Sequence, residues 1–202
     1  ESTIVSQPVA AGLLDALRAQ PVILLWFLLY GIITVVGPMS LQNSSFFFAE
    51  KFGLPPAVIG LSTTVAGVFV VVSSVLAVRP VVRCFGEVST LLLASAAQAT
   101  CFVVQPLLGV LALQLLLALV MGGLTAFPDP CILAVATIAI PKGVLGTVMG
   151  IFAGFKAGGF VLGSMLGSLL YQVNMYCPFL LLVAGHASVA LGAGLTLCIA
   201  KK

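Results

Sequence analysis

The sequence predicts an all-α membrane protein built as a single bundle of six transmembrane helices. Of its 202 residues, 61% are hydrophobic and only 6% are charged, whereas about a quarter of a soluble domain is charged. Its apolar runs exceed the roughly 18 residues that indicate a helical span. Segments of about ten residues in strict alternation, which are typical of a membrane β-barrel, are missing. We therefore expect the lipid bilayer to surround most of the chain.

Several functional classes have no residues to support them. The sequence shows no nucleophile–base pair, no metal-ligand spacing and no phosphate-binding glycine loop. Its five cysteines are scattered, with no CxxC pair, so we expect reduced thiols instead of disulfides or a metal site. The net charge of +3 is too small to indicate a nucleic-acid partner. We expect no enzymatic activity, no cofactor and no bound metal.

Residues 1–20 are the least apolar part of the chain. Leu13, Leu14 and Leu17 share one helical face, which favours a juxtamembrane helix lying in the interface, although a linker fits equally well. The chain starts with Glu1, not Met, and no signal-peptide pattern follows. We therefore expect a processed product or one part of a longer protein.

The first span is predicted at about 21–41, followed by a polar run at 42–45 and three phenylalanines at 46–48. The polar run indicates either a helix that faces a water-filled cavity or the exit from the membrane, with the phenylalanines as an interfacial anchor. A basic loop is expected at 81–87, after the second span. The remaining spans are predicted at about 57–78, 88–104, 107–140, 144–171 and 179–200, so that the bundle occupies residues 21–202.

Basic residues are unevenly divided between the two ends of the predicted bundle. Six spans place both termini on one side, which also holds Arg18, Arg79, Arg83, Lys142, Lys201 and Lys202. The other side holds only Lys51, next to Glu50. This bias predicts that both termini face the cytoplasm or its organellar equivalent. Plasma, plastid and mitochondrial membranes all fit.

Two charges lie deep within predicted spans. At about 1.5 Å per helical residue, Asp129 lies roughly 18 Å from Pro141, and Lys156 roughly 21 Å from Lys142. One such charge at a helix centre costs about 2.5–3.5 kcal/mol. Three interpretations remain: a structural ion pair, a substrate or proton site, or a snorkelling lysine. Pro130, which lacks an amide N–H, disfavours a straight helix beside Asp129.

Small residues recur every fourth position in the fifth predicted span. Gly146, Gly150, Gly154 and Gly158 form one series, and Gly159, Gly163 and Gly167 form a second on an adjoining face. Such spacing indicates close helix packing, against a helix of this chain or of another.

Isolated polar residues inside the spans indicate packing more than chemistry. His186, the only histidine, is expected to be a hydrogen-bonded core residue. Gln98, Gln105 and Gln114 are expected to form hydrogen bonds between helices.

Four stretches together form a family pattern: Phe48–Leu54 with Val58–Leu61, Gly122-Gly123 with Pro128 and Pro130, Pro141–Gly150, and Gly158–Tyr171. The pattern, over about residues 12–200, resembles the second six-helix half of a major facilitator superfamily transporter. The resemblance implies that the first and fourth helices line a central cavity, with Gln42, Asn43 and Asp129 towards it and Lys156 at its side.

The chain departs from the family in its loop motif and in its length. The loop after the second helix keeps Arg79, Arg83 and Gly86 but lacks the family's aspartate. Only one of the two halves that rock around the transport site is present.

Two functions therefore compete. The first is half of a secondary transporter, which moves a small solute together with a second half: a copy of itself, a separate chain, or another part of the same gene product. The alternative is a structural subunit of a larger membrane complex, for example an organellar respiratory or photosynthetic assembly. Pairing of Asp129 with Lys156 would favour the alternative, because the pair would then neutralise the best candidate site.

Overall fold

The computed structural model describes residues 21–140, 143 and 145–200, so the predicted interfacial segment 1–20 lies outside the described residues. The described part is helical and contains no strand. Its elements are α2 (Pro21–Phe52), α3 (Pro56–Leu76), α4 (Val78–Phe85), α5 (Glu87–Val104), the short 3₁₀ helix η1 (Gln105–Leu107), α6 (Leu111–Thr125), α7 (Pro128–Ala139), α8 (Leu145–Val173) and α9 (Cys177–Ala200).

Six of these helical stretches are long and apolar enough to cross a membrane, with α6 and α7 together forming the fourth. The predicted all-α membrane class is therefore confirmed at this level. The first helix extends well past the predicted boundary, because the polar run at 42–45 stays helical, with Gln42 and Asn43 packed against α8. The segment expected as a basic loop is instead the helix α4, which ends at Gly86 with a φ of 79°, a conformation that favours glycine.

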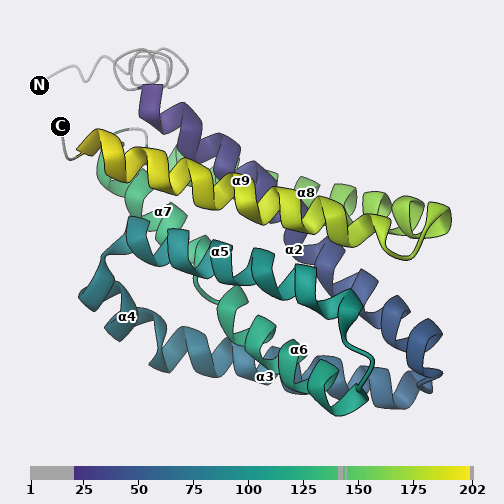
Figure 1. The fold of residues 1–202 in the computed structure, drawn as a ribbon. Helices are drawn as coiled ribbons and strands as arrows, with labels where there is room; N and C mark the ends of the chain where they lie inside the picture. The colour runs from purple at the N-terminus through teal and green to yellow at the C-terminus, as the bar shows by residue number, and fades with distance from the viewer. Residues whose placement is uncertain (1–20, 141–142, 144, 201–202) are drawn as a thin grey trace, which may run out of the picture.

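The helices form two layers, and α2 lies at the centre of the larger one (Figure 1). It packs along α8 and α9, while α5 packs along α9 and α7 lies against α5 and α2. The second layer is α3 with α6, and no residue of α3 is buried. The break between α6 and α7 lets the fourth span pass from the second layer to the first.

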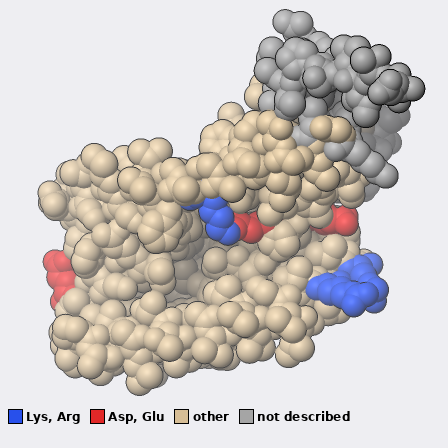
Figure 2. All heavy atoms as spheres, turned by 180° about the vertical axis from the view of Figure 1, so that it is seen from behind, with Lys and Arg blue, Asp and Glu red and all other residues tan. Residues whose placement is uncertain are grey.

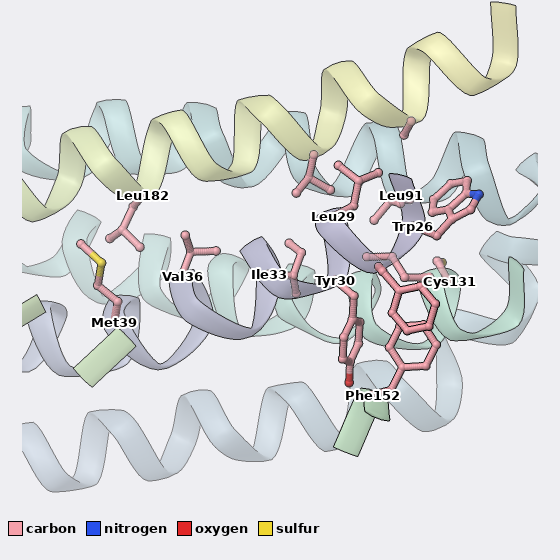
Figure 3. Packing of buried hydrophobic residues seen from close by; sticks show 14 of the residues in the cluster. Trp26, Leu29, Tyr30, Ile33, Val36, Met39, Leu91, Cys131, Phe152 and Leu182 are labelled. Atoms are coloured by element: carbon pink, nitrogen blue, oxygen red, sulfur yellow. The ribbon is translucent and has the colours of Figure 1, made fainter. Parts of the chain in front are cut away.

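Aromatic and aliphatic side chains from four helices close around α2 (Figure 3). Phe152 of α8 stacks on Phe27 with ring centroids 4.7 Å apart and meets the edge of Tyr30 at the same distance. Leu91, Cys131 and Leu182 reach the same core from α5, α7 and α9 (Figure 3). The core therefore depends on α2 more than on any other helix.

The packing pairs repeat between the two halves of the chain. The first span pairs with the fifth (α2 with α8), and the fourth pairs with the second (α6 with α3). The first also packs on the sixth (α9) and the fourth on the third (α5), while the third and sixth pair with each other. If the first, second and third spans are exchanged with the fourth, fifth and sixth, respectively, the same set of packing pairs results. Because each set has three spans, the two sets run in opposite directions.

Candidate functional site

Asp129 and Lys156 form an ion pair, with Lys156 Nζ 2.7 Å from Asp129 Oδ2. Asp129 stands in the first turn of α7, where the helix dipole favours a negative charge. Lys156 lies in the interior of α8, which packs along α2 and not along α7. The pairing argues against a lysine that snorkels to the interface.

The pair is not enclosed between helices. The Lys156 side chain is 65% exposed and that of Asp129 is 31% exposed. Figure 2 shows that this face of the molecule is hollowed between two layers, with basic and acidic atoms meeting at the hollow and the other charges near the ends. Both charges are therefore accessible from the hollow.

A cavity of about 280 Å³ lies beside the pair, and we call it the polar cavity. Every one of the six spans contributes to its wall. The contributions are Thr34 and Pro38 from α2, Val70 from α3, Gln98 from α5, Thr125, Pro128 and Asp129 from the broken fourth span, Lys156 and Phe160 from α8, and His186 from α9.

Proline removes a helical hydrogen bond on two sides of the polar cavity, although α2 itself continues through Pro38. Pro38 stands inside α2 and cannot donate to the carbonyl of Thr34. Across the cavity, the chain makes one tighter turn between α6 and α7, where Phe127 N–H donates to Leu124 O at 3.3 Å. Pro130 in turn cannot donate to the carbonyl of Ala126. The two missing hydrogen bonds fall in corresponding spans, the first and the fourth.

The inner wall of the polar cavity contains a glutamine whose orientation is determined by its partner. The Thr125 hydroxyl donates to Met121 O at 2.9 Å, so its oxygen can only accept from Gln98 Nε2, 3.0 Å away. Gln98 Oε1 therefore points away from Thr125. It is buried and has no hydrogen-bond partner among the described residues. Such an acceptor requires a donor from a ligand or a water molecule.

His186 lines the same cavity from α9. Its ring stacks on Phe102 with centroids 5.3 Å apart. The expected hydrogen-bonded core histidine is half right: the residue is 4% exposed, but its Nδ1 has no partner among the described residues. His186 is thus a buried residue that also lines the polar cavity.

A second cavity of about 390 Å³ shares Pro38, Ser40, Thr125 and Phe160 with the polar cavity. Its wall between α2, α3 and α6 is mostly apolar and carries the hydroxyls of Ser44, Ser62 and Thr63, so we call it the hydroxyl-lined cavity. The shared residues make the two cavities neighbours, with the ion pair at one end.

Gln42 and Asn43 line neither of these two cavities, and their position towards a central cavity shared with a second half stays a prediction. Gln42 Nε2 donates to Ser168 Oγ of α8 at 2.7 Å, and Asn43 is fully buried against Gly167. Both side chains face α8 because α2 turns this side towards its main packing partner. Ser40 and Ser44, on other sides of α2, line the cavities instead.

Glycines of the second series, and not the first, pack against α2. A methyl group added at Gly159 would lie 2.7 Å from the backbone of Thr34, and one at Gly163 would overlap the carbonyl oxygen of Val35. The series Gly146, Gly150, Gly154 and Gly158 has no described atom within 4 Å of an added methyl group, so its packing against a helix of another chain stays a prediction. The two faces are equally apolar, which is why spacing did not separate them.

Gln98, Gln105 and Gln114 each form a hydrogen bond that joins two spans, as expected. Gln98 joins α5 to α6, and Gln105 Nε2 donates to Ser44 Oγ of α2 at 3.2 Å. Gln114 donates to the carbonyls of Gln105 and Leu108 before its own helix.

The loop-motif residues lie apart from the site. Arg79 and Arg83 are exposed one turn apart on α4, and Gly86 ends that helix. Among the described residues, no cluster of His, Cys, Asp or Glu is able to hold a metal ion.

The sequence indicated the two charges of the site but not its inner wall. Gln98 was expected only to hold helices together, and Thr34 and Thr125 carried no signal. A polar residue in an apolar span marks an interior position, but it does not distinguish a packed seam from a cavity wall.

No protein-family model, curated protein or solved structure matches this chain.

Proposed function

We propose that the chain is the solute-binding half of a secondary transporter, resembling one half of a major facilitator superfamily protein, and that it works with a second half. One observation carries the proposal: a cavity to which all six spans contribute has an ion pair in its wall, deep within the spans. Ionisable groups at such depth cost free energy, and those that occur there usually face a cavity or pair with one another along a solute pathway.

The repeated packing pairs support the same proposal. Inverted repeats of three spans, with interrupted helices at corresponding positions, are typical of secondary transporters, and their solute sites lie between the repeats. Here the break between α6 and α7 at Pro128 and the missing backbone donor at Pro38 of the continuous helix α2 both border the polar cavity. The hollowed face would be closed by the second half, which would shield the pair from lipid.

Water access to the polar cavity tests the proposal without knowledge of the solute. Phe160 would be replaced by cysteine in a variant whose five native cysteines are serine, and the protein would be reconstituted in vesicles with any partner it retains. We expect a charged, membrane-impermeant thiol reagent to modify this position, because a transport cavity opens to water. The matched control is Leu191→Cys in α9, which like Phe160 stands in the interior of its span, is 70% exposed and lines neither cavity.

We expect the control to stay unmodified because it faces lipid. Equal protection of both cysteines, from both sides of the membrane, would exclude a transport cavity. Modification of both would show that the reagent enters the bilayer, and the comparison would be repeated with a larger reagent.

The structural-subunit alternative is favoured by one observation, the pairing itself. An ion pair that is covered by a helix of a partner chain needs no solute pathway to explain it. Because no residue of α3 is buried, this helix also offers a face that a partner chain would cover. Stable co-purification with a large membrane complex, together with protection of the cysteine at position 160, would establish this alternative.

A further inference from the structure

We propose that the polar cavity takes a small zwitterionic solute of the amino-acid type, which carries a further N–H or O–H donor that Gln98 Oε1 accepts. This inference rests on the proposed function and names the chemical class of its solute.

The charges of the site determine the charge of the solute. Asp129 and Lys156 neutralise each other at 2.7 Å. A solute with a single charge would engage one partner and leave the other unpaired within the membrane-spanning part, which is strongly unfavourable. A zwitterion brings its ammonium to Asp129 and its carboxylate to Lys156, so every charge keeps a partner. The exposure of both side chains to the hollow lets the pair open without moving a helix.

Gln98 adds a requirement for a hydrogen-bond donor. Its Nε2 is engaged by Thr125, which leaves Oε1 as a buried acceptor with nothing to accept from. Only 3% of the surface of Gln98 is exposed, and this residue lines the same cavity as the ion pair. A hydroxyl or amide N–H on the solute would satisfy this oxygen, and an apolar group would leave it unsatisfied at a cost of affinity.

The size and the walls of the cavity limit the rest of the solute. A volume of about 280 Å³ holds a small organic molecule and no polymer. Phe160 and Val70 provide apolar contacts beside the charged end. The neighbouring hydroxyl-lined cavity offers room for a larger side chain.

Calorimetric titration of the chain in lipid nanodiscs, with four matched probes, tests the proposal. Serine is a zwitterion with a hydroxyl, serinamide lacks the carboxylate, glycerate lacks the ammonium, and alanine lacks the hydroxyl. We expect serine to bind at least about tenfold more tightly than serinamide or glycerate, a difference of about 1.4 kcal/mol. Serine should also bind more tightly than alanine, and Gln98→Met should remove that second difference. Gln114→Met, a buried glutamine outside both cavities, is the control and should leave it unchanged.

Two variants of the pair separate this inference from the proposed function. Neutralising both charges with Asp129→Asn and Lys156→Gln should abolish serine binding, and the reversal Asp129→Lys with Lys156→Asp should restore part of it in a folded protein. Serinamide or glycerate could instead bind as tightly as serine and lose this binding in the neutral double variant. That result would overturn the requirement for a zwitterion but would leave the proposed transport site intact. Absence of binding by all four probes, with the cysteine at position 160 still open to water, would likewise overturn the inference alone.

Discussion

Asp129 and Lys156 show how two costly residues become tolerable together. Each alone would cost about 2.5–3.5 kcal/mol at the centre of a span. The contact at 2.7 Å removes the net charge, and the hollow face lets water or a partner solvate both groups. The pair is therefore stable in place yet weakly held, which suits a group that exchanges partners.

A double-mutant cycle on the pair gives a prediction at the residue scale. Asp129→Asn and Lys156→Gln should each lower the free energy of unfolding, because each leaves one charge unpaired. The double variant should lose less than the sum, with a coupling energy of about 1 kcal/mol for a partly exposed pair. Unfolding in mixed micelles measures all four proteins. Strictly additive effects would show that the two charges do not interact in the folded protein.

Lys51 lies in the last turn of α2 and stabilises the end of the bundle at which this helix terminates. Its Nζ donates to Pro106 O at 2.7 Å and to Leu108 O at 2.9 Å, and it lies 4.8 Å from the centre of the Phe47 ring. These carbonyls follow the end of α5, where no helical amide is available. One ammonium thus ties the end of the first span to the end of the third.

Replacing Lys51 by methionine should destabilise the protein by about 1–3 kcal/mol, because two carbonyls lose a charged donor. Lys51→Arg keeps the charge and the donors and should recover most of the loss. Thermal unfolding of both variants in the same detergent provides the measurement. An unchanged midpoint for the methionine variant would mean that water replaces the ammonium at no cost.

At the scale of elements, the contact between α2 and α8 depends on glycine. Gly159 and Gly163 let the backbones of α2 and α8 approach, because Thr34 and Val35 occupy the space that side chains at these two positions would fill. Gly122 does the same between α6 and α3, where an added methyl group would lie 2.9 Å from Ala66 O. The two close contacts occupy corresponding places in the repeated packing pairs.

Two alanine substitutions in α8 should have opposite effects. Gly163→Ala places a methyl group on the Val35 carbonyl and should destabilise the protein by about 1–3 kcal/mol, since the helices must separate. Gly154→Ala meets no described atom within 4 Å and should stabilise α8 by up to about 1 kcal/mol through helix propensity. Unfolding midpoints of the two variants decide the matter. A similar loss in both would indicate that the Gly154 face also packs against a partner.

At the scale of the whole molecule, the ends of the bundle carry different charge. The start of α2, the end of α9 and the basic helix α4 lie at one end, and the turns after α2 and α8 lie at the other (Figure 1). This arrangement agrees with an even number of spans. By the positive-inside tendency, the described basic residues Arg79 and Arg83 predict that the first end faces the cytoplasm or its organellar equivalent.

Thiol labelling from each side of the membrane tests this orientation. The native Cys84 is exposed on α4, and a cysteine at Gln172 would be exposed near the opposite end of the bundle. With the other cysteines replaced, an impermeant reagent should modify Cys84 only from the cytoplasmic side and position 172 only from the other side. Modification of both from one side would require an even number of spans between them, instead of the three that separate them in the structure.

The sequence alone showed that the chain belongs in a lipid bilayer and how many spans it has. The lengths of its apolar segments and the placement of its charges follow directly from the cost of burying polar groups in lipid. It also indicated Asp129 and Lys156. It did not identify which glycine series packs, nor that Gln98 lines a cavity while Asn43 meets α8. In a bilayer, the faces that meet lipid and the faces that meet other helices are both apolar. Hydrophobic periodicity then loses the contrast that marks a core in water, and only the tertiary packing around α2 decided which faces meet.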